Sequence, residues 1–159
     1  EREIVESPDV ATYDRQPAMH APELTDAVVG RIGREDPDVL VLNYANPDMV
    51  GHTGDFDAAV AAVEAVDEQL ERLVAACHDA GAHVLVTADH GNADDMGTGE
   101  DPHTAHTLNP VPFISLPSEG GDSDVTVRET GTLADLAPTL LDRMDIEAPD
   151  AMAGEPLLE

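Results

Sequence analysis

Carboxylates and imidazoles, the side chains that bind divalent metal ions, gather in three short segments of this chain. The first segment carries Asp48 and His52, the second carries Asp89 and His90, and the third carries His106. Because no thiol is among them, Mn²⁺, Zn²⁺ or Mg²⁺ at a reactive site is more plausible than a structural zinc ion. Such metal ions usually act on phosphate or carbonyl oxygen, so the set predicts a catalytic metal centre.

Each pair taken alone is also open to a plainer interpretation. Asp48 and His52 share one face of a helical turn if Gly51 does not break it, but Asp48 can instead cap the turn while His52 is solvated. Asp89 and His90 would point in opposite directions within a strand and can converge only beyond its end. The occurrence of all the clusters at strand boundaries or in one long loop favours metal binding.

The other histidines and nearby acids are not expected to be ligands. His103 shares the loop of His106 and can at most support a ligand from outside the coordination sphere. Asp94 and Asp95 are expected to solvate that loop. Three further histidines have no partner pattern: His20, His78 and His83.

Apolar runs beside the ligand segments are typical of strands that are covered on both faces. The strands are expected at residues 39–43, 84–87 and 111–116, with Pro112 near an edge or at the first ladder position. In open α/β sheets, sites form at the carboxyl ends of parallel strands. We therefore expect one mainly parallel sheet with the ligands at its edge.

Amphipathic periodicity predicts three helices, at residues 23–32, 57–79 and 132–144, the last with a kink or restart at Pro138. In the helix at 57–79, Asp55 or Asp57 can form the N-cap, Gly81 ends it, and Val60 and Val63 belong to its apolar side. The alternation of strands and helices predicts an α/β fold with three α/β/α layers, in which this helix packs on the sheet as a crossover.

The remaining segments are expected to be mostly irregular. Residues 1–21 are broken by prolines, and residues 91–109 form a long polar loop of a length that is usually functional. A Gly-rich loop is expected at 118–124 and a short strand at 125–127.

The charge balance is extreme, with 34 acidic residues against 7 basic ones, no lysine, and a net charge of −27. Phosphate backbones repel such a surface, which argues against non-specific nucleic-acid binding. The acids are scattered among periodic apolar segments, so adaptation to high salt, where repulsion is screened, is favoured over a disordered acidic tail.

Length and cysteine content set further bounds. A chain of 159 residues has room for one domain with a real core. The single cysteine, Cys77, excludes an intrachain disulfide, and no apolar run approaches a membrane span. We expect a cytoplasmic protein, and the absence of an initiating Met suggests a piece of something longer.

Four segments closely match one known family: NYANPDMVGHTG (43–54), TADHGNADDM (87–96), PHTAHTLNPVP (102–112) and LADLAPTLLDRM (133–144). In these segments the chain resembles cofactor-independent (2,3-bisphosphoglycerate-independent) phosphoglycerate mutase of the alkaline phosphatase superfamily. The resemblance continues through residues 11–29 and 152–158, in order along nearly the whole chain. It implies an alkaline-phosphatase-like α/β fold.

The resemblance also implies a ligand assignment. Asp48, His52 and His106 correspond to the ligands of one Mn²⁺, and Asp89 and His90 to ligands of a second. Residues 1–159 correspond to the C-terminal part of the metal-binding domain. The rest of that domain, with the nucleophilic Ser, and the inserted phosphotransferase-type domain have no counterpart here, so this chain supplies no catalytic nucleophile.

The implied reaction is the glycolytic and gluconeogenic interconversion of 3-phosphoglycerate and 2-phosphoglycerate through a phosphoserine. The implied partner is this small-molecule substrate, with no nucleic acid or membrane, and the full-length enzyme is expected to be a monomer. One departure from the family is Asp9, where a lysine is common. The alternatives are another phosphatase or phosphomutase of the superfamily, or a non-catalytic metal-binding fragment.

Overall fold

The computed structural model describes residues 1–118 and 125–159, and the chain divides into two compact units, residues 1–119 and 120–159. All five predicted metal ligands lie in the first unit. The Gly-rich loop predicted at 118–124 lies, except for Ser118, outside the described residues.

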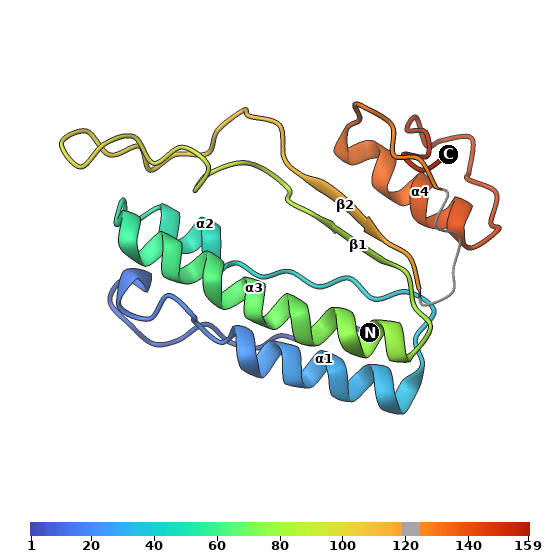
Figure 1. Cartoon of the computed structure of the whole chain (residues 1–159), viewed down its shortest axis with the longest axis horizontal. Helices are drawn as coiled ribbons and strands as arrows, with labels where there is room; N and C mark the ends of the chain where they lie inside the picture. The colour runs from blue at the N-terminus through green and yellow to red at the C-terminus, as the bar shows by residue number, and fades with distance from the viewer. Residues whose placement is uncertain (119–124) are drawn as a thin grey trace. The chain divides into compact units, whose positions relative to one another are not determined.

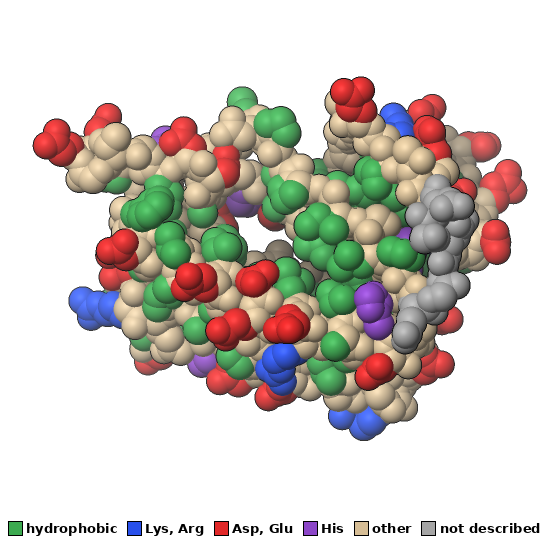
Figure 2. All heavy atoms as spheres, viewed as in Figure 1, with side chains coloured by type: hydrophobic (Ala, Val, Ile, Leu, Met, Phe, Trp, Pro, Cys, Tyr) green, Lys and Arg blue, Asp and Glu red, His purple; other side chains and the backbone are tan. Residues whose placement is uncertain are grey.

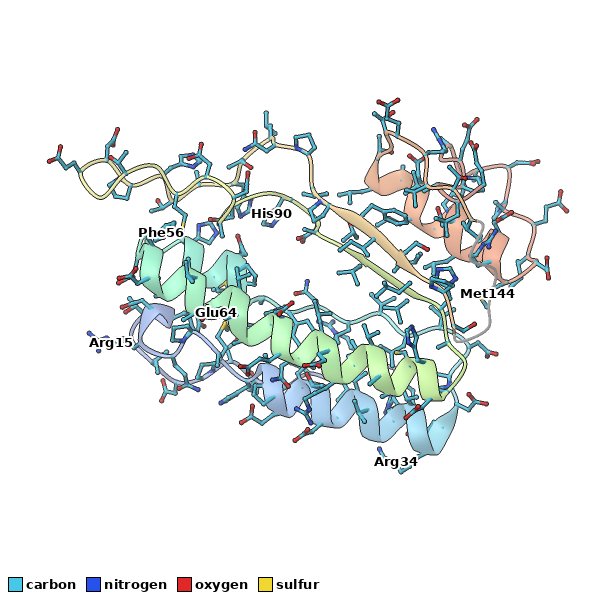
Figure 3. All side chains as sticks on the ribbon, viewed as in Figure 1. Arg15, Arg34, Phe56, Glu64, His90 and Met144 are labelled. Atoms are coloured by element: carbon cyan, nitrogen blue, oxygen red, sulfur yellow. The ribbon has the colours of Figure 1, made fainter. Side chains whose placement is uncertain are left out.

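The described residues of the first unit form the helices α1 (Ala21–Glu35), α2 (Asn46–Gly51) and α3 (Phe56–Asp79), and α2 and α3 enclose its small core (Figure 1). The α3 helix begins as predicted, because the Asp55 carboxylate accepts a hydrogen bond of 2.9 Å from the backbone N–H of Ala58. It ends as predicted before Gly81, whose φ of 72° is a left-handed conformation that glycine adopts at low cost. Figure 3 shows Phe56 at the beginning of this helix.

The α3 helix packs mainly against α1 and α2. In its N-terminal half the buried face consists of small residues, Ala58, Ala59 and Ala62, which pack with Val50 of α2, and further along it buries Gln69 and Leu73. Two of the larger apolar side chains predicted to face a sheet remain open, since Val60 is 41% exposed and Val63 is 49% exposed, whereas Leu73 on the same side is buried. The prediction that α3 covers the sheet as a crossover is therefore wrong for this chain taken alone.

Among the described residues, the sheet of the first unit has two strands, β1 (Val84–Thr87) and β2 (Phe113–Leu116), which pair antiparallel with Val84 opposite Leu116. The prediction of a mainly parallel arrangement is wrong for this pair. Parallel neighbours need a crossover connection, usually a helix, whereas residues 88–112, all of them described, contain no helix. Pro112 stands immediately before the first ladder residue of β2, as its missing N–H predicts.

Residues 39–43, the third predicted strand, form no ladder in the described part of the chain. The segment connects α1 to α2 (Figure 1), and its side chains are alternately exposed and half-buried. Val39 is 47% exposed and Val41 is 86% exposed. The composition indicates a strand covered on both faces, but the described residues supply no ladder partner and leave the side of Val39 and Val41 without cover.

The long polar segment 91–109 contains neither helix nor strand, as predicted, but it has internal order. Isolated antiparallel bridges join Gly91 to Thr107 and Gly97 to Pro102, so the segment forms a narrow arm between β1 and β2 (Figure 1). Met96 anchors the arm, because its side chain is only 8% exposed and belongs to the core cluster with Val50.

The second unit contains a 3₁₀ turn, η2 (Leu133–Asp135), that continues into α4 (Leu136–Arg143). The helix predicted at 132–144 is thus confirmed, with a change of helix type shortly before Pro138. Thr132 and Asp135 form a capping box. The strand predicted at 125–127 is reduced to a single antiparallel bridge between Val127 and Leu158.

Acidic side chains are spread over the visible face of the molecule rather than gathered in one block (Figure 2). This distribution agrees with the scattered acids of the sequence. Among the described residues, none of the helices is long and apolar enough to cross a membrane.

Candidate metal centre

The short helix α2 presents Asp48 and His52 on one face. The turn continues through Gly51, because the backbone N–H of His52 donates a 3.0 Å hydrogen bond to the carbonyl of Asp48. Val50 is fully buried beside them and fixes the helix on α3. As a result His52 Nε2 lies 3.2 Å from Asp48 Oδ1, as the four-residue spacing predicts for an unbroken turn.

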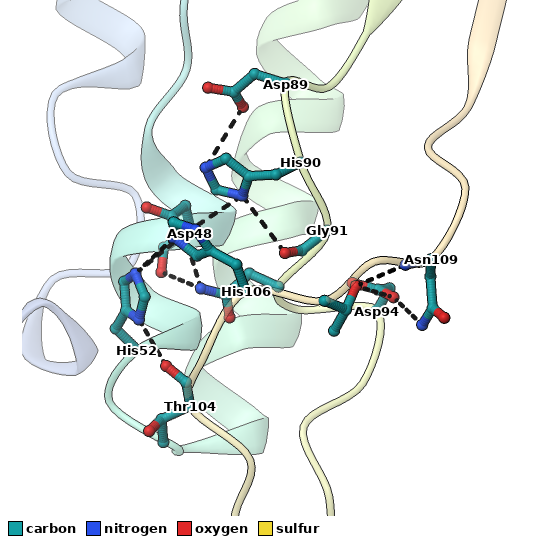
Figure 4. Close-up of polar contacts among 11 residues, drawn as sticks. Asp48, His52, Asp89, His90, Gly91, Asp94, Thr104, His106 and Asn109 are labelled. Carbon is teal, nitrogen blue, oxygen red and sulfur yellow. Dashed lines mark hydrogen bonds and ion pairs between the residues drawn. The ribbon is translucent and has the colours of Figure 1, made fainter. Parts of the chain in front are cut away.

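The arm brings His106 to the same point from a distant part of the sequence (Figure 4). His106 Nε2 lies 3.2 Å from Asp48 Oδ1 and 3.2 Å from His52 Nε2. Together with the 3.2 Å contact between His52 and Asp48, these distances define an equilateral triangle of three potential ligand atoms.

The size of this triangle fits a metal ion. Oxygen and nitrogen ligands at roughly 2.0–2.2 Å from one ion, in tetrahedral or octahedral arrangement, lie about 3.0–3.5 Å from one another. The observed separations of 3.2 Å fall within this range. The donor set of one carboxylate and two imidazoles suits a borderline divalent cation.

The tautomer of His52 is fixed in the form that metal binding requires. His52 Nδ1 donates a 2.6 Å hydrogen bond to the backbone carbonyl of Thr104, and a carbonyl can only accept. The proton of neutral His52 therefore sits on Nδ1 and the lone pair of Nε2 points into the triangle. A backbone carbonyl that orients a ligating imidazole in this way is common at metal sites.

His90 and Asp89 adjoin the triangle, on the segment that follows β1 (Figure 4). The ring of His90 stacks on that of His106 with centroids 3.7 Å apart, and His90 Nδ1 lies 4.0 Å from Asp48 Oδ1. Its other nitrogen, Nε2, lies 3.7 Å from Asp89 Oδ1. Ligand atoms of Asp48, His90 and His106 all lie within 4.8 Å of one another.

The structure thus gathers all five predicted ligands in one place, and the assignment of each to a particular ion stays a prediction. The cluster is open to solvent, because its members keep much of their surface. The exposed fractions of the side chains are 31% for Asp48, 39% for His52, 29% for His90, 50% for His106 and 73% for Asp89. Further ligands or a substrate can therefore approach from outside.

Sequence reasoning missed Asn92 as a functional side chain. It is 5% exposed, and its amide Nδ2 donates a 2.7 Å hydrogen bond to Asp48 Oδ1. A Cβ atom at Gly51 would come within 2.4 Å of Asn92 Oδ1, so the glycine makes room for this contact. The sequence contained one sign of this contact: Gly51, a glycine inside a short helix, stands between the predicted ligands Asp48 and His52.

Asp94 is exposed on the loop, as expected, and it also makes hydrogen bonds within the loop that the sequence did not indicate. Its two carboxylate oxygens accept hydrogen bonds from Thr107 Oγ1 at 3.0 and 2.9 Å, and Oδ2 also accepts one from Asn109 Nδ2 at 2.6 Å (Figure 4). The hydrogen bond from Asn109, followed by that from Thr107, lowers the pKa of Asp94 below its ordinary value.

Three of the remaining histidines contact other groups, and His78 lies on α3 away from the cluster. His103 Nδ1 donates to the carbonyl of Asp95 at 2.9 Å and stabilises the arm rather than the cluster. His20 Nδ1 donates to the carbonyl of Glu6 at 2.7 Å, and His83 Nε2 pairs with the Ser115 hydroxyl at 2.8 Å.

A family model described as the metalloenzyme superfamily matches residues 1–148, and the chain belongs to this superfamily. The names of curated relatives indicate which members of the superfamily the chain resembles. Over 158 residues it is 68% identical to the 2,3-bisphosphoglycerate-independent phosphoglycerate mutase of Natronomonas pharaonis and 66% identical to that of Halobacterium salinarum. A homologue from Psychrobacter arcticus with the same name is 56% identical over 159 residues.

These alignments cover 99% of this chain but only 31%, 31% and 28% of the respective relatives. The chain therefore spans about a third of the length of the curated relatives that it matches. The relatives from halophilic organisms agree with the acidic composition.

A solved structure confirms the fold. A crystal structure of Leishmania mexicana phosphoglycerate mutase, described at low cobalt concentration, matches with a TM-score of 0.89 and 34% identity. The match covers 99% of this chain and 31% of the mutase. The chain thus has the α/β, alkaline-phosphatase-like fold predicted from its sequence.

Proposed function

We propose that this chain is the C-terminal, metal-binding part of a phosphoglycerate mutase that interconverts 3-phosphoglycerate and 2-phosphoglycerate without a bisphosphoglycerate cofactor. The observation that carries the proposal is the 3.2 Å triangle of Asp48, His52 and His106. The names of the relatives add the substrate and favour a mutase over other phosphatases or phosphomutases of the superfamily.

Five residues would hold two metal ions, for which Mn²⁺ is the proposed identity. Asp48, His52 and His106 would bind one ion, and Asp89 and His90 would contribute to the second. Divalent metal ions supply charge neutralisation at phosphoryl oxygens and lower the pKa of a coordinated hydroxyl. The described residues would supply no nucleophile, and the phosphoserine would form on a residue from the remainder of the enzyme.

The remainder of the enzyme is proposed to complete the same domain and to add a phosphotransferase-type domain. Two features of the first unit support additional cover from that remainder. The segment 39–43 has the composition of a covered strand, yet Val41 is 86% exposed. Figure 2 shows an opening in the visible face of the molecule, with hydrophobic side chains around it.

This arrangement has a simple test. The substitution Val41→Asp should barely change the stability of the 159-residue chain, because the side chain is already exposed. It should strongly destabilise a full-length enzyme in which Val41 is covered. Equal small effects in both would contradict the proposal.

The proposed setting is the cytoplasm, with the full-length enzyme acting as a monomer on a small phosphorylated acid. A surface with a net charge of −27 supports the absence of nucleic-acid partners.

The activity is tested in a full-length enzyme carrying these residues, with 3-phosphoglycerate as substrate. Asp48→Ala or His52→Ala should reduce turnover by orders of magnitude with the fold retained, whereas His20→Ala, remote from the cluster, should not. The 159-residue chain alone should be inactive. A full-length enzyme that hydrolyses phosphate esters without forming 2-phosphoglycerate would establish the alternative, a phosphatase.

A further inference from the structure

His106 is the most exposed imidazole of the metal cluster, with half of its side-chain surface open to solvent. Burial therefore contributes less to its position than it does for Asp48 or His90, which are 31% and 29% exposed. A ligand on an exposed arm loses side-chain and backbone freedom when it binds a metal ion. The residues that hold the arm in place should consequently influence how strongly the metal binds.

The arm is attached on both sides of His106. On one side, the carbonyl of Thr104 accepts the hydrogen bond from His52 Nδ1. On the other side, the backbone N–H of Thr107 donates a 2.8 Å hydrogen bond to the carbonyl of Gly91, directly after His90. The second attachment therefore joins the neighbours of His106 and His90, the two rings that stack at 3.7 Å.

The Asp94 carboxylate contributes to this second attachment, because it contacts Thr107. It accepts from Thr107 Oγ1 and from Asn109 Nδ2, and the Thr107 hydroxyl in turn accepts a 3.4 Å hydrogen bond from the backbone N–H of Asn109. A Cβ atom at Gly91 would lie 2.1 Å from Thr107 Oγ1 and 2.6 Å from Asp94 Oδ1. The glycine thus leaves the space in which Asp94 and Thr107 meet.

We propose that Asp94 is a positioning residue that holds His106 against His90 and Asp48 through Thr107 and Asn109. The inference rests on the proposed metal site and deepens it. Hydrogen bonds from neutral side chains occupy both oxygens of the Asp94 carboxylate, so the group orients the arm instead of joining the ligand set.

The test compares Asp94→Ala with a matched control, Asp95→Ala. Both remove one exposed carboxylate from adjacent positions of the arm, but the Asp95 side chain accepts from the backbone N–H of Gly97 and not from Thr107. Mn²⁺ affinity is measured by titration calorimetry in molar KCl. The geometry of the ligands is followed by the visible absorption of bound Co²⁺, and the metal-free melting temperature is recorded for each variant.

Loss of an orienting partner outside the coordination sphere typically weakens metal binding by about 10–100-fold, and we expect the lower end because Asp94 acts one residue away from His106. Asp94→Ala should therefore bind Mn²⁺ about 10-fold more weakly. It should also alter the Co²⁺ absorption, with a melting temperature close to that of Asp95→Ala. The isosteric change Thr107→Val should have a similar effect, and the double variant should be little worse than either single one.

Other outcomes overturn the proposal. Equal affinity and unchanged Co²⁺ absorption in Asp94→Ala and the parent chain would mean that Asp94 does not position His106. Equal losses of Mn²⁺ affinity in Asp94→Ala and Asp95→Ala would mean that removing any negative charge from the arm weakens binding, without a positioning role for Asp94. Failure of the parent chain itself to bind Mn²⁺ or Co²⁺ would instead contradict the proposed metal site on which the inference rests.

Discussion

The buried amide of Asn92 donates a 2.7 Å hydrogen bond to Asp48 Oδ1, the same oxygen that lies 3.2 Å from His52 Nε2 and from His106 Nε2. Asn92 and Asp48 are separated by 44 residues, so the contact ties the segment after β1 to helix α2. An amide proton directed at one carboxylate oxygen fixes the rotation of the carboxylate. The metal-facing geometry of Asp48 is therefore set before any ion arrives.

Replacement of Asn92 by Ala should weaken Mn²⁺ binding by about 10–100-fold, because the Asp48 carboxylate loses its orienting donor. Asn43→Ala, at an exposed asparagine, serves as the control and should leave the affinity unchanged. Titration calorimetry of both variants checks the expectation. Wild-type affinity in Asn92→Ala would show that Asp48 needs no such support.

Two glycines within helices should respond oppositely to alanine. At Gly51 the new Cβ would approach Asn92 Oδ1 to 2.4 Å, so Gly51→Ala should displace Asn92, lower stability by about 1–3 kcal/mol and weaken metal binding. Gly33 in α1 has open space around the corresponding position, so Gly33→Ala should stabilise the chain by about 0.5–1 kcal/mol. Thermal melts measure both. A Gly51→Ala variant as stable as Gly33→Ala would contradict the packing described around Asn92.

Asp135 makes the stability of the second unit depend on pH. Hydrogen bonds from the backbone N–H groups of Glu155 at 2.9 Å and Thr132 at 2.7 Å lower the pKa of its carboxyl group. A depressed folded pKa contributes stability that is fully present above the ordinary pKa of aspartate and is lost as pH falls through the folded value. Asp135→Asn should therefore destabilise the chain at neutral pH, and its deficit should shrink under strong acid. A deficit that is constant with pH in denaturant melts would exclude this role of the charge.

The net charge of −27 should make the chain sensitive to salt. Stability should rise from low to molar KCl, because mobile ions screen the repulsion between acidic side chains. Screening is nearly complete by about 1 M, so a further gain above that concentration would indicate hydration effects beyond screening. Melting temperatures recorded across this range provide the measurement. A flat or falling series would contradict adaptation to high salt.

Local signals in the sequence predicted several features of the fold correctly. Asp55 at the start of α3, Gly81 beyond its end and Pro112 before β2 each act through their own backbone chemistry, which a sequence displays directly. The ligand set was also visible, because Asp48 and His52 needed only one unbroken helical turn to converge.

Features that depend on partners distant in the sequence were not predicted. The apolar run at 39–43 and the open side chains of Val60 and Val63 indicate cover that residues 1–118 and 125–159 do not supply. Their composition is that of core residues, but several of their side chains are exposed. The antiparallel pairing of β1 and β2 follows from a connection without a helix, which the apolar pattern of the strands does not reveal. Asn92 and Asp94 act through hydrogen bonds to residues 44, 13 and 15 positions away.

Titration of Mn²⁺ into the 159-residue chain tests the central claim most directly. The account predicts measurable binding that falls more than about 100-fold in His106→Ala, since loss of a ligand should exceed the effect of an outer partner. Binding should be unchanged in His20→Ala, where the imidazole donates to the carbonyl of Glu6, away from the cluster. Loss of binding in His20→Ala with full binding in His106→Ala would contradict the assignment of the metal centre to Asp48, His52 and His106.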